Sequence, residues 1–355
     1  MRGLELARRF YFDGVRPVLD DRFPRLPHAA ALIGPGSEVL GFDDEMSQDH
    51  HWGPRLQLFV SKDAPVDEID ATLRDRLPTD VAGFPTHFGD PDDIGVRLLT
   101  PLDGGPVSHL VEIVSLGAFL EERIGVDPRT GFAVADWLAT PAQRLAELTG
   151  GAVFNDDEGE LTRVREALSF YPHDVWLLVM AGLWRRVAQL EHFLGRTGSV
   201  GDDVGSRIVA ASLVRDLMRV ALIQERRYPP YWKWLGTAYA NVGRPEAAAL
   251  EAALSASTWQ EREDAVVAAY EAVAERHNEL GVTRHVEPSV RQFWGRPFRV
   301  LFADRFVDAL RAAIDDPDVQ AIEHDAGSID SVSDNTDVLT RPFLWRAFAD
   351  LYDRP

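Results

Sequence analysis

The sequence predicts an α+β protein in which a small mixed-sheet domain is followed by an all-helical bundle. Residues 29–33 and 56–60 are short apolar runs bounded by glycine and proline, which is typical of buried strands. Beyond about residue 135, apolar residues recur at helical spacing over long segments. The chain has 355 residues, enough for two cores, and we expect domains at residues 1–130 and 131–355.

The first domain is expected to contain two helices besides these strands. The apolar residues at helical spacing near the amino terminus are Leu4, Ala7, Phe10, Tyr11, Val15 and Val18. A second helix follows residues 56–60 and is marked by Val66, Ile69, Leu73 and Leu77. It is expected to end at Pro78, because proline cannot continue a helix.

Two further strands are predicted over residues 95–100 and 107–116, joined as a hairpin through Asp103-Gly104-Gly105. Side chains alternate between the two faces of a strand. Glu112 therefore shares a face with Leu110 and Val114, and it places a carboxylate in an otherwise apolar run. Alternatively, Glu112 is an ordinary glutamate that faces water from an edge strand.

The second domain is expected to be a helical bundle. Helices are predicted over residues 175–194, 208–223, 231–239, 246–256 and 265–280, with a final pair over 300–314 and 343–351. A polar loop, residues 325–337, separates that pair. No repeat of fixed period is present, which favours a bundle over a solenoid.

The composition restricts the classes of partner. With 57 acidic and 37 basic residues the formal net charge is −20, which disfavours extended binding to nucleic-acid phosphates and favours cationic small molecules. There is no cysteine, so disulfides, thiolate catalysis and cysteine-bound zinc are excluded. The sequence has neither an apolar run near 20 residues nor a secretory signal, and we expect a cytoplasmic protein without a membrane partner.

The stretch from residue 34 to residue 60 has the layout of a phosphate site. Gly34-Pro35-Gly36-Ser37 follows one predicted strand, and Asp49-His50-His51 precedes the next. Small residues let backbone N–H groups approach phosphate oxygens, and a carboxylate nearby can hold a divalent cation. An ordinary glycine-proline turn and a solvated aspartate explain the same residues, and spacing alone does not separate the two interpretations.

This stretch resembles the nucleotidyltransferase superfamily, whose hallmark is Gly-Ser followed after roughly ten residues by Asp-any-Asp/Glu. More narrowly, the segments GPGSEVLGFDDEMSQDHHWGPRLQLFV, YPHDVW, GRTGSVGDDVGS and YPPYWKWLG are similar to the bacterial family of nucleotidyltransferase-like proteins that carry the domain of unknown function 4037. The resemblance covers nearly the whole chain. It implies the two-domain shape of kanamycin nucleotidyltransferase.

The resemblance also implies roles for individual residues. Gly36 and Ser37 would bind the phosphates of ATP or another nucleoside triphosphate, and Asp49 would hold a divalent cation. Glu112 would be the third carboxylate, acting as metal ligand or general base. His51 stands where the superfamily has its second acidic residue. Imidazole in this position weakens a Mg²⁺ site and suits Mn²⁺, Zn²⁺ or no metal. The cofactor that the resemblance implies is a divalent cation, Mg²⁺ or Mn²⁺, with His51 as an expected ligand.

Three residues of the second domain are further candidates for nucleotide contacts. Tyr231 could stack on a base, and Lys233 could neutralise a phosphate. Arg196, in the polar connection between two predicted helices, could pair with a phosphate. Aromatic core packing, with Trp234 in the core, and a simple helix connection explain the same segments.

Two functional hypotheses follow. The first is metal-dependent transfer of a nucleoside monophosphate to a hydroxyl of a small-molecule acceptor, for which the acidic composition suits a cationic compound such as an aminoglycoside. The second is a catalytically degenerate nucleotide-binding or interaction protein, because His51 replaces a carboxylate. Asp49-His50-His51 is also similar to a signature of phosphoesterases that bind two Mn²⁺ ions, but there an apolar strand precedes it, whereas here Glu45-Met46-Ser47-Gln48 does.

Overall fold

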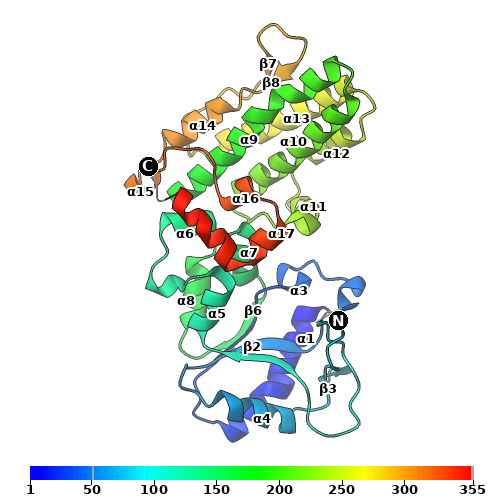
Figure 1. The fold of residues 1–355 in the computed structure, drawn as a ribbon, viewed down its shortest axis with the longest axis vertical. Helices are drawn as coiled ribbons and strands as arrows, with labels where there is room; N and C mark the ends of the chain where they lie inside the picture. Colours follow the sequence, from blue (N-terminus) through cyan, green and yellow to red (C-terminus); the bar gives the residue numbers. More distant parts are fainter. Residues whose placement is uncertain (50–51, 94, 353–355) are drawn as a thin grey trace. The chain divides into compact units, whose positions relative to one another are not determined.

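The computed structural model describes residues 1–49, 52–93 and 95–352, and it confirms the expected α+β class (Figure 1). The described chain divides into two compact units. The first unit is Met1–Gly131 with Arg144–Ser169, and the second unit is Phe132–Gln143 with Phe170–Pro355. The return of the chain to the first unit adds a strand to its sheet.

A four-stranded mixed sheet organises the first unit. Its order is β5-β2-β1-β6, with β1 (Ala29–Leu32), β2 (Arg55–Phe59), β5 (Leu110–Val114) and β6 (Ala152–Asp156). β1 is antiparallel to β2 and to β6, whereas β2 and β5 are parallel. The register pairs Ala31 with Gln57 and Gln57 with Glu112, so these three residues form one row across the sheet. The strands predicted at residues 29–33 and 56–60 are thereby confirmed.

The predicted hairpin was wrong. Residues 95–100 form no strand, and Leu99 makes only an isolated bridge to Phe88. Around this bridge, the N–H of Gly89 donates to the carbonyl of Leu98 and the N–H of Thr100 donates to that of His87. The guanidinium of Arg97 also donates to the carbonyls of Phe88 and Gly89. β5 pairs in parallel with β2, which requires a crossover, and α4 (Val66–Arg76) lies in that crossover.

β6 was not anticipated, because it lies inside a region whose apolar residues have helical spacing. It is flanked by α7 (Ala142–Thr149) and α8 (Glu160–Ala167). Its five residues are all half-buried, so no alternating apolar pattern marks the strand. Two-residue strands form two minor ladders, β3 (Asp80–Val81) with β4 (Phe84–Pro85) and β7 (Arg291–Gln292) with β8 (Arg299–Val300).

The two faces of the sheet differ in chemistry. One face packs on the amino-terminal helix, which comprises α1 (Gly3–Arg9), a π-helical segment (Phe10–Val15) and α2 (Arg16–Arg22), and on α4. The core residues there include Phe10, Leu56, Leu58, Leu73 and Val111. By alternation, Arg55, Gln57 and Glu112 point to the other face. α5 (Leu116–Ile124) contributes Phe119, which packs edge-on against Phe59 on that face.

The second unit is a helical bundle, and its long helices confirm the predicted pattern. α9 (His173–Ser199) packs against α10 (Asp203–Gln224), α13 (Trp259–Glu279) and α14 (Asp304–Arg311). The remaining helices of this unit are α6 (Val134–Ala139), α11 (Trp232–Ala240), α12 (Ala247–Ser255), α15 (Pro317–Gln320), α16 (Ile329–Val332), α17 (Thr336–Thr340) and α18 (Pro342–Trp345), with a 3-10 turn over Arg346–Leu351. None of the helices within the described ranges is long and apolar enough to cross a membrane.

We expect His277 to make the stability of the second unit depend on pH. Its ring is fully buried on α13, between Trp184 and Phe306, and burial lowers its pKa to about 4. The unfolded chain binds a proton below about pH 6.5 and the folded chain does not, so the free energy of unfolding falls as pH drops from 6.5 to 4. His277→Gln should remove roughly 3 kcal/mol of this dependence in urea titrations. The exposed His285→Gln should retain the wild-type dependence.

Gly182 is expected to be required where α9 meets the backbone of Gly327. A Cβ at residue 182 would lie 2.3 Å from the Cα of Gly327, and neither backbone can move cheaply. Gly182→Ala should therefore cost about 1–3 kcal/mol of unfolding free energy. Gly236→Ala on α11, where a Cβ meets no atom within 4 Å, should add about 0.5–1 kcal/mol. Equal shifts in the two variants would contradict the close approach.

Candidate functional site

The candidate site begins at the turn that follows β1. Gly34 and Gly36 have φ values of +85° and +152°, which side chains rarely adopt, and the chain then enters α3 (Ser37–Leu40). A Cβ at Gly36 would lie 2.5 Å from Nη2 of Arg55 and 2.6 Å from Oε2 of Glu38. Glycine at residue 36 therefore lets the turn approach an ion pair.

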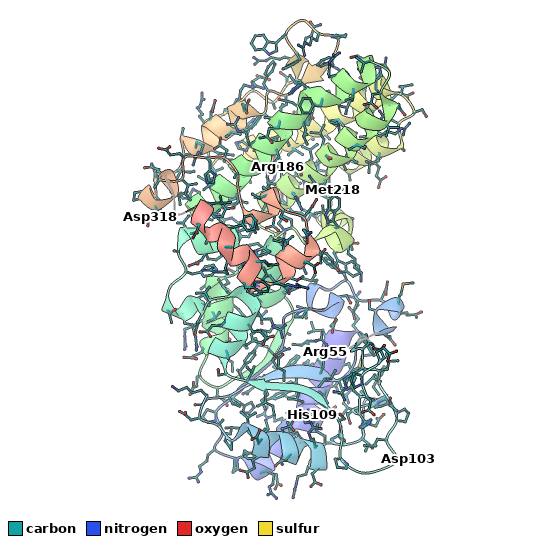
Figure 2. The ribbon with its side chains drawn as sticks, in the orientation of Figure 1. Arg55, Asp103, His109, Arg186, Met218 and Asp318 are labelled. Carbon is teal, nitrogen blue, oxygen red and sulfur yellow. The ribbon has the colours of Figure 1, made fainter. Side chains whose placement is uncertain are left out.

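That ion pair joins β2 to the first turn of α3. Arg55, which is the first residue of β2 and is labelled in Figure 2, donates from Nε (3.0 Å) and Nη2 (2.6 Å) to Oε1 of Glu38. Nη2 also donates to the carbonyl of Pro35 at 2.9 Å. The side chains are 15% and 6% exposed, so water screens the pair little. Within the described residues, Nη1 of Arg55 has no acceptor.

Gln57 connects the turn to Glu112. Its Oε1 accepts from the N–H of Ile33 at 3.0 Å, directly before Gly34, and its Nε2 donates to Oε2 of Glu112 at 3.2 Å. The backbone donor fixes the orientation of the amide, so Gln57 must present its NH₂ group to Glu112. The structure thus brings Glu112 within one bridging side chain of the predicted phosphate turn.

Arg123 on α5 is the second partner of Glu112. Its Nη2 lies 3.3 Å from Oε1 of Glu112, and its guanidinium stacks over the ring of Phe119. The Nε of Arg123 is buried and has no acceptor among the described residues. The Glu112 side chain is 34% exposed and remains accessible to a ligand.

Among the described residues, no cluster of side chains suited to a divalent cation is found. No group of three His, Asp or Glu residues that could hold a metal occurs among them. β2 presents Arg55 and Gln57 to the row, and a cation at Glu112 would face the positive charge of Arg123. Of the predicted ligands besides Glu112, Asp49 ends the 3-10 helix Glu45–Asp49, but its side chain lies outside the described part, as does His51.

The turn residues are free to receive a ligand. In the described chain, the hydroxyl of Ser37 makes no hydrogen bond, and the N–H groups of Gly36 and Ser37 donate none. Ser37 is half-buried at the start of α3. The predicted contacts of Gly36 and Ser37 with phosphate stay predictions that this geometry permits.

Tyr231, Lys233 and Arg196 belong to the second unit. The backbone N–H of Tyr231 donates to Gln143, and Nζ of Lys233 lies 5.0 Å from the Trp234 ring. Trp234 is half-buried, whereas the alternative interpretation placed it in the core. The predicted nucleotide-binding roles of Tyr231, Lys233 and Arg196 remain predictions.

Arg196 is remote from the other two candidates of the second unit. It is exposed in the last turn of α9, next to the start of α10 at Asp203. The guanidinium of Arg215 lies over the ring of Trp232, the neighbour of Tyr231 and Lys233. Arg215 is twelve residues after Asp203 on α10, which corresponds to roughly 18 Å along the helix. The structure therefore does not bring Arg196 together with Tyr231 and Lys233.

Four residues of the candidate site were not predicted from the sequence: Glu38, Arg55, Gln57 and Arg123. A signal for two of them exists, because Arg55 and Gln57 are polar at alternate positions of an otherwise apolar strand, as Glu112 is in β5. Glu38 and Arg123 lie on helices, where charged residues are common. Their importance follows only from the contacts.

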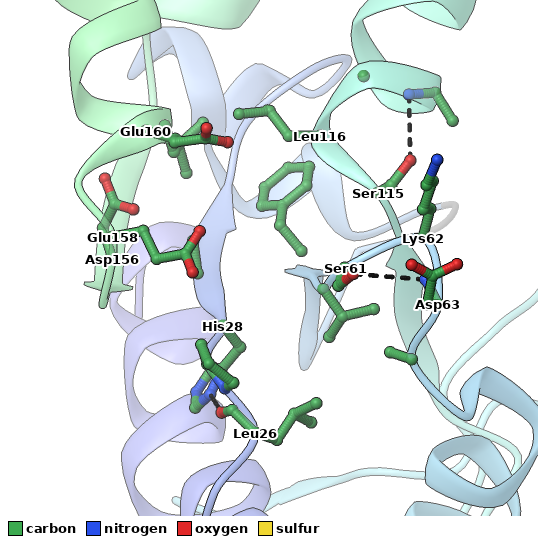
Figure 3. A pocket seen from close by; sticks show the side chains of 18 of the residues that line it. Leu26, His28, Ser61, Lys62, Asp63, Ser115, Leu116, Asp156, Glu158 and Glu160 are labelled. Carbon is green, nitrogen blue, oxygen red and sulfur yellow. Dashed lines mark hydrogen bonds between the residues drawn. The ribbon is translucent and has the colours of Figure 1, made fainter.

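A hollow of about 740 Å³ lies at the opposite end of β1 and β2 (Figure 3). Its apolar wall includes Leu26, Phe59 and Leu116. Figure 3 shows Lys62 and Asp63 on one side and Asp156, Glu158 and Glu160 on the other. Its lining carries the carboxylates of Asp63, Glu121, Asp156, Glu158 and Glu160 against Lys62 and Arg129. Because negative charge predominates, the hollow suits a cation and repels a triphosphate.

Part of the chain is similar to a known protein family. Residues 137–235 match a family model described as a domain of unknown function, DUF4037, which confirms the predicted resemblance over this segment. The segment contains Arg196, Tyr231 and Lys233. A crystal structure of a nucleotidyltransferase-like protein from Exiguobacterium sibiricum is similar at 11% identity, with a TM-score of 0.35 and 76% of each chain covered. No curated protein matches the chain.

We expect Gly36→Ala to disrupt the Arg55–Glu38 pair. The new Cβ would overlap the guanidinium and force an unfavourable φ, at a cost of about 1–3 kcal/mol of unfolding free energy. Gly41→Ala is the matched control, because its φ of +77° is also unfavourable but its Cβ meets nothing within 4 Å. The double variant Gly36→Ala/Arg55→Ala should cost less than the sum of its singles, and strict additivity would contradict the contact.

Proposed function

We propose that the chain, whose residues 137–235 match the DUF4037 family model, is a nucleotidyltransferase that moves a nucleoside monophosphate from a nucleoside triphosphate to a hydroxyl of a small-molecule acceptor. The observation that carries the proposal is the convergence of the Gly34–Ser37 turn, Gln57 and Glu112 on one face of the sheet. A phosphate group at the turn would meet the free N–H groups of Gly36 and Ser37.

Glu112 is proposed as the general base of the transfer. The acceptor oxygen forms a bond to the α-phosphorus, the bond to the bridging oxygen breaks, and pyrophosphate leaves with the electron pair. The hydroxyl proton passes to the carboxylate of Glu112, which Gln57 and Arg123 hold in place. Asp49 is the second proposed catalytic residue. A divalent cation, Mg²⁺ or Mn²⁺, is the cofactor that the resemblance implies, and no step here depends on it.

The acidic hollow supports a cationic acceptor. It opens at Ser115, three residues after Glu112 along β5, which corresponds to about 10 Å. An acceptor whose amines pair with the carboxylates of the hollow could present a hydroxyl toward Glu112 over that distance. The overall charge of −20 also draws such a compound toward the protein.

A second candidate function is nucleotide binding without transfer. The observation that favours it is the chemistry of the polar face, to which β2 contributes Arg55 and Gln57 and on which Arg123 already pairs with Glu112. A protein of this kind would bind the nucleotide and release no pyrophosphate.

The two candidates are separated by measuring pyrophosphate release and label transfer from α-labelled ATP with Mg²⁺ and with Mn²⁺. If transfer occurs, Glu112→Gln should reduce its rate about 100-fold or more, because a neutral amide accepts no proton. Asp49→Ala should do the same. Glu68→Gln, an exposed glutamate on α4, is the control and should retain the wild-type rate.

The variant His51→Asp tests whether the histidine has abolished catalysis. If the natural histidine impairs a cation site, this variant should raise metal-dependent transfer at least tenfold. ATP binding without release in either metal, by wild type and by His51→Asp alike, would reject transfer and leave the binding function.

A further inference from the structure

The positive charge beside the phosphate turn comes from two arginines, and both are paired with carboxylates; Arg123 also lies 3.8 Å from the exposed carboxylate of Glu122. Arg55 pairs with Glu38 at the turn, and Arg123 pairs with Glu112 across the row. Gln57 joins these two pairs through Ile33 and Glu112. The described face therefore carries both arginines and their carboxylate partners in one polar array, with Gln57 between the two pairs.

From this array we infer that the triphosphate is neutralised by Arg55 and Arg123 without a bridging cation. The inference rests on the proposed function, because it assumes that the turn binds a nucleoside triphosphate. Guanidinium groups pair with phosphate through two parallel N–H···O bonds. A metal ion at Glu112 would be repelled by Arg123, whereas a phosphate is attracted by both arginines.

Arg55 is already positioned for this role. Its Nη2 bonds the carbonyl of Pro35 within the turn, so the guanidinium is fixed beside the free N–H groups of Gly36 and Ser37. Nη1 has no acceptor in the described part of the chain and is available to a phosphate oxygen. The missing side chain at Gly36 keeps the route between the guanidinium and the turn open.

Arg123 contributes from the other side of the row. Phe119 supports its guanidinium, and its buried Nε lacks an acceptor among the described residues. A phosphate oxygen that reached this nitrogen would satisfy it and would compete with Glu112 for the charge. The two carboxylates thus act as substitutes for phosphate until the nucleotide binds.

The test is the affinity of the full-length chain for ATP, measured by calorimetry in EDTA and in Mg²⁺. We expect binding in EDTA to remain within about threefold of that in Mg²⁺. Arg55→Met should weaken ATP binding in EDTA about 10- to 100-fold, and Arg123→Met should weaken it in the same direction. Arg74→Met, an exposed arginine paired with Asp70 on α4, is the matched control and should bind as wild type does.

Glu38→Gln gives a readout that a structural role would not produce. It removes the competing charge but keeps an oxygen for Arg55, so ATP should bind about threefold or more tighter. A residue that only maintains the fold would weaken binding when changed. Thermal unfolding of each variant reports whether it is folded, and tripolyphosphate should compete with ATP in wild type.

The outcomes separate this inference from the function on which it rests. Binding that EDTA abolishes and Mg²⁺ or Mn²⁺ restores, with Arg55→Met equal to Arg74→Met, overturns the arginine role and leaves the proposed function standing. Absence of ATP binding with and without metal overturns the proposed function itself. Binding in EDTA that is lost in Arg55→Met supports the inference.

Discussion

The side-chain amide of Gln57 is the interaction on which the candidate site depends. It accepts from Ile33 at the end of β1 and donates to Glu112 on β5, so one residue of the middle strand determines how its two neighbours are placed. Gln57 is 4% exposed, and a buried amide must satisfy both of its ends. Its replacement by an apolar residue would leave the N–H of Ile33 without an acceptor directly before the turn.

The contrast between the two faces of the sheet explains why such a polar row is tolerated. The other face buries Leu56, Leu58 and Val111 against the amino-terminal helix and α4, which gives the first unit its apolar core. The polar face can then hold the Arg55–Glu38 pair, because burying these charges costs free energy that the core offsets. Buried ion pairs are a weak source of stability, so their presence here is more readily explained by ligand binding than by folding.

Sequence alone predicted the parts of the fold whose side chains follow a simple period. The runs at residues 29–33 and 56–60 became β1 and β2, and the long apolar periodicity became α9, α10 and α13. The prediction for residues 95–100 failed because this segment pairs only briefly, through Leu99, with Phe88 and not with residues 107–116, and no periodic pattern shows that partner. β6 failed because it is half-buried throughout and completes its sheet only through contacts distant in sequence.

Residues of the candidate site were predictable only where a polar side chain interrupts an otherwise apolar strand. Glu112 interrupts an apolar strand and was found; Arg55 and Gln57 do the same in β2 and were overlooked beside the more familiar pattern at Asp49 and His51. Helical residues such as Arg123 carry no such signal, since a charged residue on a helix is ordinary. Their partners are fixed by the parallel pairing of β2 with β5, which depends on the crossover through α4.

The distribution of charge along the sheet bears on how an acidic protein could bind the proposed triphosphate. A net charge of −20 and the carboxylates of the hollow repel phosphate at one end of β1 and β2, whereas Arg55 and Arg123 place positive charge beside the turn that follows β1. Affinity there is set by the difference between arginine–phosphate and arginine–carboxylate pairs. Such exchange favours polyanions, because a ligand with a single charge gains little by displacing Glu38 or Glu112. A triphosphate can engage Arg55 together with the N–H groups of the turn, which no carboxylate of the chain does.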